Sequence, residues 1–69
     1  MDPHKTGTFI AALRRGKNMT QEDLAQRVGV RRETIGNLEK GRYNPSLVLA
    51  WRIAQVFSVP IEEIFIIEA

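Results

Sequence analysis

The chain of 69 residues contains no cysteine and a single histidine, His4. Without cysteine, neither a disulfide framework nor a cysteine-ligated zinc site is available, and one histidine cannot build a metal site alone. No apolar run approaches the roughly 20 residues that a membrane-spanning helix needs, and no signal peptide is evident. We therefore expect a soluble, cytoplasmic protein with no metal, no cofactor and no membrane contact.

The usual residues of an enzyme active site are also missing. The sequence offers no cysteine nucleophile, no glycine loop that would hold a phosphate and no evident buried carboxylate pair. The predicted function is therefore non-enzymatic. A chain of this length forms one small domain, so we expect residues 1–69 to fold as a single unit.

Charge is distributed unevenly, although the formal net charge is only +2. Residues 1–45 hold nine of the ten Lys and Arg against five acidic residues, and residues 46–69 hold one base against three acidic residues. A basic end is suited to facing phosphate groups, but chance can produce the same imbalance in so short a chain. The charge pattern alone does not select a partner.

The segment 21–40, QEDLAQRVGVRRETIGNLEK, has the pattern of two short helices joined by a sharp turn. Ala25 is small where the second helix has to approach the first. Gly29 stands where the chain leaves the first helix, at a position that we expect to have positive φ. An apolar seam is supplied by Leu24, Val28, Val30, Ile35 and Leu38. An ordinary helix pair would share the small residue and the glycine, but the whole pattern indicates a DNA-binding helix-turn-helix.

Capping residues predict two helices up to residue 28. Asp2 and Pro3 are suited to begin the first helix, with Thr6 as an alternative cap, and the helix should end near residues 16–18. Thr20 and Asp23 form a capping-box pattern at the start of the second helix, which we place at residues 21–28. The third helix should then run from about residue 32 to residue 40.

The C-terminal part predicts two further helices. Ser46 is suited to cap a fourth helix, and Pro60 to open a short fifth one. The apolar stripe of the fourth helix is Leu47, Ala50, Ile53, Ala54 and Phe57. Residues 64–67 are apolar and suited to either helix or strand. The prediction is an all-α, compact domain of five helices.

Three stretches of the chain, FIAALRRGKNMTQEDLAQRVGV, RRETIGNLEKGRYNPSL and RIAQVFSVPIEEIF, carry a family resemblance. In order and spacing they resemble the lambda Cro and C1-type (XRE) helix-turn-helix family, in its short stand-alone form, across residues 5–65. The resemblance implies a lambda-repressor-like fold, with helices two and three as the helix-turn-helix, and a DNA-binding transcriptional regulator. It also implies a partly buried structural ion pair between Arg14 and Glu39.

The third helix should present its polar face to the DNA major groove. Arg32 can donate two parallel hydrogen bonds to guanine, Glu33 can accept one from cytosine, and Asn37 can pair with adenine. The alternative is a solvated polar face without DNA contact. The resemblance supports four base-contacting residues, namely Arg31, Arg32, Glu33 and Asn37.

Two residues of this helix are unusual. Arg31 stands where a Ser or Thr commonly caps the helix, which removes a cap worth about 1 kcal/mol. Gly36 costs roughly 1 kcal/mol relative to alanine in a helix interior. It either lets the helix backbone approach the DNA or reflects sequence drift, and the residues alone do not separate these explanations.

Phosphate contacts are expected on both sides of the third helix. The resemblance assigns one to Gln21, at a helix N-terminus whose N–H groups and dipole also favour an anion. The other candidates follow the third helix and are Lys40, Arg42, Tyr43 and Asn44. Asn44 can instead serve only to shape the turn before Pro45.

The region 48–69 has more apolar residues than a small core requires, which predicts a dimerisation surface. The candidate interface residues are Leu49, Trp51, Ile61, Ile64 and Ile66. A two-fold dimer would place two recognition helices about 34–36 Å apart on a palindromic site. Alternatively, Trp51 and the isoleucines merely complete the core.

Together these observations predict a sequence-specific transcriptional regulator that binds double-stranded DNA as a homodimer. It would act as a repressor by covering a palindromic operator. The alternative is an antitoxin-like or adaptor protein that acts mainly on a protein partner through its apolar C-terminal face.

Overall fold

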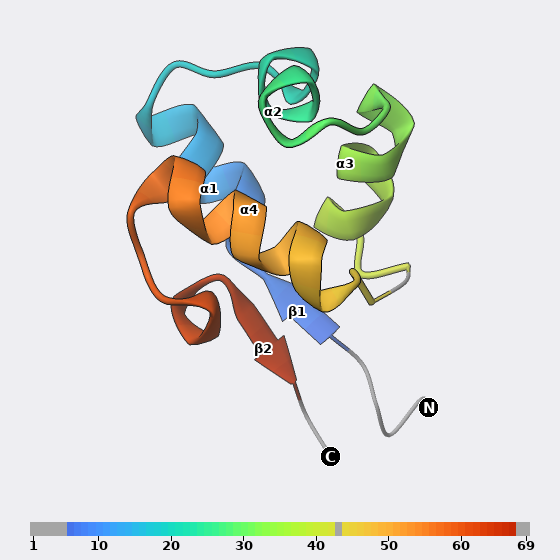
Figure 1. Ribbon diagram of the computed structural model, residues 1–69, viewed down its shortest axis with the longest axis vertical. Coiled ribbons are helices and arrows are strands. Elements are labelled where there is room, and N and C mark those ends of the chain that lie inside the picture. The colour runs from blue at the N-terminus through green and yellow to red at the C-terminus, as the bar shows by residue number, and fades with distance from the viewer. Residues whose placement is uncertain (1–5, 43, 68–69) are drawn as a thin grey trace.

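The computed structural model describes residues 6–42 and 44–67. In chain order its elements are β1 (Thr6–Thr8), α1 (Ile10–Gly16), α2 (Gln21–Val28), α3 (Arg32–Glu39), α4 (Leu47–Phe57), the 3-10 turn η1 (Ile61–Glu63) and β2 (Phe65–Ile67). Figure 1 shows α2 and α3 at one end of the long axis, with β1 and β2 side by side toward the other. The body of the domain is helical, as predicted, but the described residues form four α-helices where five were expected.

The first helix begins at Ile10, later than either predicted start. Thr6, the alternative cap, belongs to β1, and Asp2 and Pro3 lie outside the described residues. Strand β1 pairs antiparallel with β2, and the pairing continues where the Phe9 N–H donates to the Ile64 carbonyl at 2.8 Å. Because the partner strand lies at the far end of the sequence, local capping signals do not reveal this pairing.

The predicted fifth helix is a single turn, η1, that begins after Pro60. The chain then continues into β2, so the apolar tail is a strand and not a helix. Ile66 is in β2 opposite Gly7, and its side chain lies outside what the structure describes. The tail is a strand because β1 supplies the hydrogen-bonding edge that its backbone groups pair with.

Helix α2 has the predicted bounds and both predicted caps. The Thr20 hydroxyl accepts from the Asp23 N–H at 3.0 Å, and the Asp23 carboxylate accepts from the Thr20 N–H at 2.9 Å. At the other end Gly29 is left-handed, with φ of 77° and ψ of 33°. The chain can therefore turn sharply into α3, because glycine adopts this conformation without strain.

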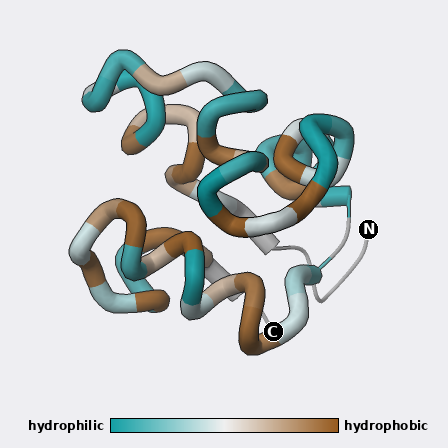
Figure 2. Tube along the Cα trace, turned by 45° about the horizontal axis from the view of Figure 1, so that its top comes forward, coloured by the Kyte–Doolittle hydropathy of each residue, from teal (hydrophilic) through white to brown (hydrophobic). Residues whose placement is uncertain are grey.

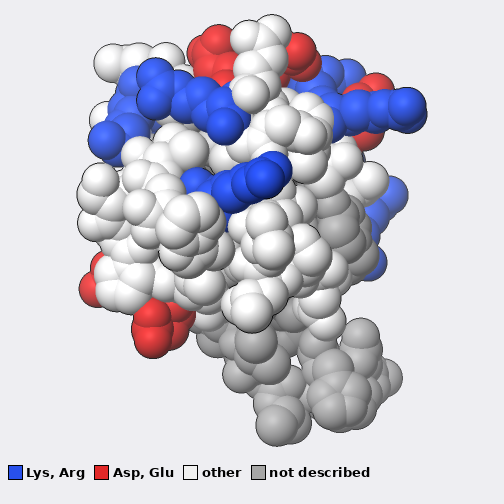
Figure 3. Space-filling view, in the orientation of Figure 1, with Lys and Arg blue, Asp and Glu red and all other residues white. Residues whose placement is uncertain are grey.

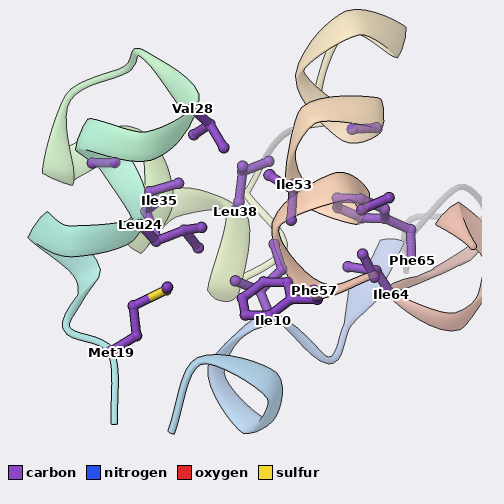
Figure 4. Close-up of a cluster of buried hydrophobic side chains, with 13 residues drawn as sticks. Ile10, Met19, Leu24, Val28, Ile35, Leu38, Ile53, Phe57, Ile64 and Phe65 are labelled. Carbon is purple, nitrogen blue, oxygen red and sulfur yellow. The ribbon is translucent and has the colours of Figure 1, made fainter. Parts of the chain in front are cut away.

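The hydrophobic core lies between the α2–α3 pair on one side and α4 with β2 on the other (Figure 4). Figure 2 shows hydrophobic residues interspersed with hydrophilic ones along the chain, and the core draws its side chains from the hydrophobic ones. Ala25 is 1% exposed on α2, so its small side chain lies in the packed interior as predicted. The large side chains with essentially no exposed surface are Ile10, Leu24, Val28, Ile35, Leu38, Ile53 and Ile64.

The distribution of apolar side chains differs from the prediction at two positions. Ile64, predicted at a dimer interface, is 0% exposed and is therefore unavailable to a second copy. Leu47, predicted in the core, is 78% exposed because it opens α4 one turn before the core begins at Ala50. Leu49 and Ile61 are half-buried against the core, whereas Val48 and Trp51 remain exposed.

The capping box makes the stability of the fold sensitive to pH. Hydrogen bonding to Thr20, above all from the Thr20 backbone N–H, lowers the pKa of the Asp23 carboxyl below its ordinary value. A carboxyl that binds its proton less tightly in the folded state stabilises the fold at neutral pH and loses this contribution as the pH falls through the folded-state pKa. We expect the wild type to lose more stability than Asp23→Asn between neutral pH and pH about 3. Urea unfolding at a series of pH values measures this, and parallel pH profiles of the two proteins would contradict it.

Candidate nucleic-acid interface

Three helices meet at the carboxylate of Glu39, the last residue of α3. Arg14 on α1 donates from Nε to Glu39 Oε2 at 2.9 Å and from Nη2 to Oε1 at 3.3 Å. Gln21, the first residue of α2, donates from Nε2 to the same Oε1 at 3.0 Å. Arg14 and Glu39 are only 11% and 9% exposed, so this is a largely buried ion pair with two charge-assisted hydrogen bonds. The resemblance implied the ion pair but not the bond from Gln21.

The same arginine also fixes the connection between α1 and α2. Arg14 Nη1 donates to the carbonyl of Met19 at 2.9 Å, just before the capping box that begins α2. Arg14 therefore holds the loop and the end of α3 with one planar group, which a lysine cannot do in the same geometry. This arrangement fixes where the N-terminus of α2 lies relative to α3.

Gln21 is positioned by this cluster and remains half-exposed. A carboxamide nitrogen carries two protons, and one of them is directed at Glu39. The second can be donated to an external acceptor. Gln21 also stands in the first turn of α2, where backbone N–H groups have no acceptor within the helix. Both features suit a phosphate oxygen.

The outer face of α3 carries the predicted base-contacting residues. Arg31, Arg32 and Glu33 are exposed, and Asn37 is half-buried. Arg31 precedes the helix in an extended conformation and makes no side-chain capping bond, so the sequence-based expectation of a missing cap agrees with the structure. Since Ile35 and Leu38 fill the core, this face is directed away from the protein.

An open hollow lies beside this face, between the end of α1, the start of α2 and Arg32. Gln21 and Arg32 both line it, as does Arg15, which the sequence analysis did not single out. Arg15 directly follows Arg14 in α1. Because the Arg14 side chain points inward to Glu39, the Arg15 side chain lies on a different side of the helix, and this position in the sequence could have identified it as a candidate. Figure 3 shows Lys and Arg side chains gathered toward the end that holds α2 and α3, with some acidic groups among them.

The remaining predicted phosphate contacts follow α3. Lys40 and Arg42 are exposed, and the Arg42 N–H donates to the Asn37 carbonyl at 3.0 Å, which stabilises the turn after the helix. Asn44 is exposed on the following segment, and Tyr43 lies outside the described residues. The structure thus places basic groups after α3 as well as beside its start.

A separate surface on α4 is apolar. Leu47, Val48 and Trp51, which are 78%, 59% and 55% exposed, line an open hollow together with Arg52. We call these three apolar residues the α4 surface. Single exposed apolar side chains are ordinary, but three large ones around one hollow are typical of a contact surface.

Other kinds of site find no support in the described part of the chain. Within residues 6–42 and 44–67, no three His, Asp or Glu side chains are grouped so that they could hold a metal ion. No helix among these residues is both long and apolar enough to cross a bilayer.

Comparison with known proteins gives consistent similarities. The model of the helix-turn-helix family HTH_3 matches residues 10–64. An uncharacterized HTH-type transcriptional regulator of Archaeoglobus fulgidus is 64% identical over 61 residues, which cover 88% of this chain and 86% of the relative. The uncharacterized HTH-type transcriptional regulator MJ0272 of Methanocaldococcus jannaschii is 61% identical over 51 residues, covering 74% of this chain and 77% of the relative.

A solved structure is also similar to this chain. The crystal structure of the restriction-modification controller protein C.AhdI from Aeromonas hydrophila superposes with a TM-score of 0.72 at 33% sequence identity. The superposition covers 78% of this chain and 82% of that protein. The arrangement of helices described above is therefore shared with a protein of detectable sequence similarity.

The contacts of Glu39 predict a stability effect. We expect Glu39→Gln to lower the free energy of unfolding by about 2–4 kcal/mol, because it leaves the largely buried Arg14 charge without its partner. Glu22→Gln is the matched control, since Glu22 is exposed and accepts an exposed hydrogen bond from Gln26 at 3.3 Å. That control should stay within about 0.5 kcal/mol of the wild type. The hydrogen-bonded side chains of Arg14, Gln21 and Glu39 form what we call the Glu39 cluster. If urea unfolding gave the same loss of free energy for both variants, this cluster would not be structurally important.

Proposed function

The chain belongs to the helix-turn-helix family HTH_3, whose members are DNA-binding transcriptional regulators, and from this premise we propose a sequence-specific repressor that binds a palindromic operator as a homodimer. Its phosphate contacts position the domain on the duplex, and its base contacts select the site. Repression follows because the bound protein covers promoter DNA that the polymerase needs. The single observation that carries the proposal is the outward polar face of α3, held in place from behind by the Glu39 cluster.

Base reading falls to the exposed residues at the start of α3. Arg32 is exposed and lines the open hollow, where its guanidinium can donate two parallel hydrogen bonds to the O6 and N7 atoms of a guanine. Arg31 and Glu33 flank it, and Asn37 lies one turn further along the helix. Half-burial of Asn37 restricts its side chain to fewer orientations, which suits a directional hydrogen bond to an adenine.

Phosphate anchoring is supported on both sides of α3. Gln21 offers the second proton of its carboxamide, and Arg15 adds a positive charge in the same hollow. Lys40 and Arg42 offer the corresponding contacts after the helix, with Tyr43 and Asn44 as the remaining candidates. Contacts at both ends of a recognition helix fix its register in the groove.

Dimerisation is best supported at the α4 surface. Of the interface residues that the sequence indicated, Ile64 is buried, Leu49 and Ile61 are half-buried, and Trp51 stays exposed. The exposed apolar area therefore gathers at the start of α4, next to Trp51. A two-fold contact there brings the same patch of both copies together, as isologous dimers require.

The α4 surface also favours one second candidate function. A protein partner with an apolar groove fits the same residues as a second copy, and the chain would then act as an antitoxin-like or adaptor protein. The two functions differ in whether the protein associates with itself and whether it selects a DNA sequence.

Selection of bound sequences from a random duplex library tests the DNA-binding proposal. We expect a palindromic site whose half-site centres are about one helical turn apart. Arg32→Ala should weaken binding to that site by about tenfold or more and relax the preference at one position of each half-site. Arg27→Ala is the control, because Arg27 is an exposed arginine of α2 outside the α3 face, and its loss changes the net charge equally. Sequence-blind binding that disappears with added salt would contradict the proposal.

Trp51 reports on dimerisation directly, because it is the only tryptophan. We expect its fluorescence emission to shift to shorter wavelength as protein concentration rises, since a second copy would cover its exposed ring. Trp51→Glu should remain folded but monomeric in sedimentation equilibrium, whereas Phe9→Glu, at an aromatic residue that is 48% exposed outside the α4 surface, should still dimerise. A wild type that stays monomeric at every concentration would favour the second candidate function.

A further inference from the structure

Gly36 is the residue of α3 whose identity the fold does not explain. The backbone conformation does not require a glycine at position 36. Gly29 and Gly41 have positive φ values of 77° and 68°, whereas Gly36 has an ordinary helical conformation. Any residue adopts that conformation, and most form helices better than glycine. The explanation therefore has to come from space or from contacts.

Packing does not require a glycine either. A Cβ atom built on Gly36 would lie 3.9 Å from both the Nε2 and the Oε1 atom of Gln21, and these are the nearest atoms in the described part of the chain. This separation is an ordinary van der Waals contact, so an alanine would fit without moving its neighbours. Within the described residues, alanine at position 36 would gain helix stability at no steric cost.

The position of Gly36 on α3 gives a reason for the missing side chain. It follows Arg32 by four residues, so the two share one face of α3, and its neighbour across the helix pair is the carboxamide of Gln21. Arg32 and Gln21 line the same open hollow. Gly36 is therefore one helical turn from the group proposed to read a guanine and next to the group proposed to hold a phosphate.

We propose that Gly36 is a specificity-determining residue, at which the backbone of α3 comes into van der Waals contact with the operator. This inference rests on the proposed DNA-binding function. A methyl group at this point would hold α3 away from the groove and cover one side of the Gln21 carboxamide. Arg32 and Gln21 would then no longer reach base and phosphate together. The glycine lowers helix stability and in return allows deeper insertion of α3.

Gly36→Ala tests this with two measurements on the full chain, thermal unfolding and affinity for the selected operator. We expect the unfolding midpoint to rise by about 2–6 °C, because a mid-helix glycine is removed. Affinity for the operator should fall about tenfold or more, comparable to the effect of a mismatched base pair. Binding to a random duplex should change less than about twofold, because a non-specific complex depends on charge and not on close approach.

Gly16→Ala is the matched control. Gly16 is the last residue of α1, is exposed, and has no atom within 4 Å of a built Cβ. Its replacement should leave operator affinity unchanged. The inference is overturned if Gly36→Ala binds the operator as tightly as the wild type, or if it lowers the unfolding midpoint, which would assign the glycine to the fold. If the wild type selects no operator, the proposed function fails instead, so the two failures are distinguishable.

Discussion

The buried carboxylate of Glu39 is the constraint on which the geometry of this domain depends. It accepts hydrogen bonds from Arg14 on α1 and from Gln21 on α2, while its own backbone ends α3. Helices of seven or eight residues are marginal by themselves, and α3 lacks a side-chain cap. The orientation of the recognition helix therefore comes from tertiary contacts, and the ion pair supplies the directional part of them.

This arrangement links the stability of the domain to its proposed function. Gln21 is held by Glu39 through one amide proton, so the side chain that is expected to contact phosphate does not need to be ordered on binding. The core behind α3 fixes its inner side through Ile35 and Leu38, whereas Arg32 and Glu33 on the outer side are exposed. The α4 surface and the proposed base-contacting residues lie on different elements, α4 and α3.

Two glycines, or two arginines, have different roles in this short chain because their structural surroundings differ. Gly29 is required by a left-handed backbone, whereas Gly36 has neither a backbone nor a packing requirement among the described residues. Arg14 is enclosed in an ion pair, and Arg15, its neighbour in sequence, is exposed beside the hollow. Sequence patterns identify such residues as unusual or basic, but the physical reason follows from distances and exposure.

The sequence by itself determined the features whose causes are local. The Thr20–Asp23 capping box, the turn at Gly29 and the Ser46 cap all depend on residues within one turn of each other, and all were predictable. Tertiary structure decided the features that depend on distant partners. The β1–β2 pairing made a strand of Thr6, an expected helix cap, and it decided that the tail, which suited either helix or strand, is a strand; Ile64, expected at an interface, is buried. A strand has no local partner for its backbone groups, so its existence is decided by where the rest of the chain places the second strand.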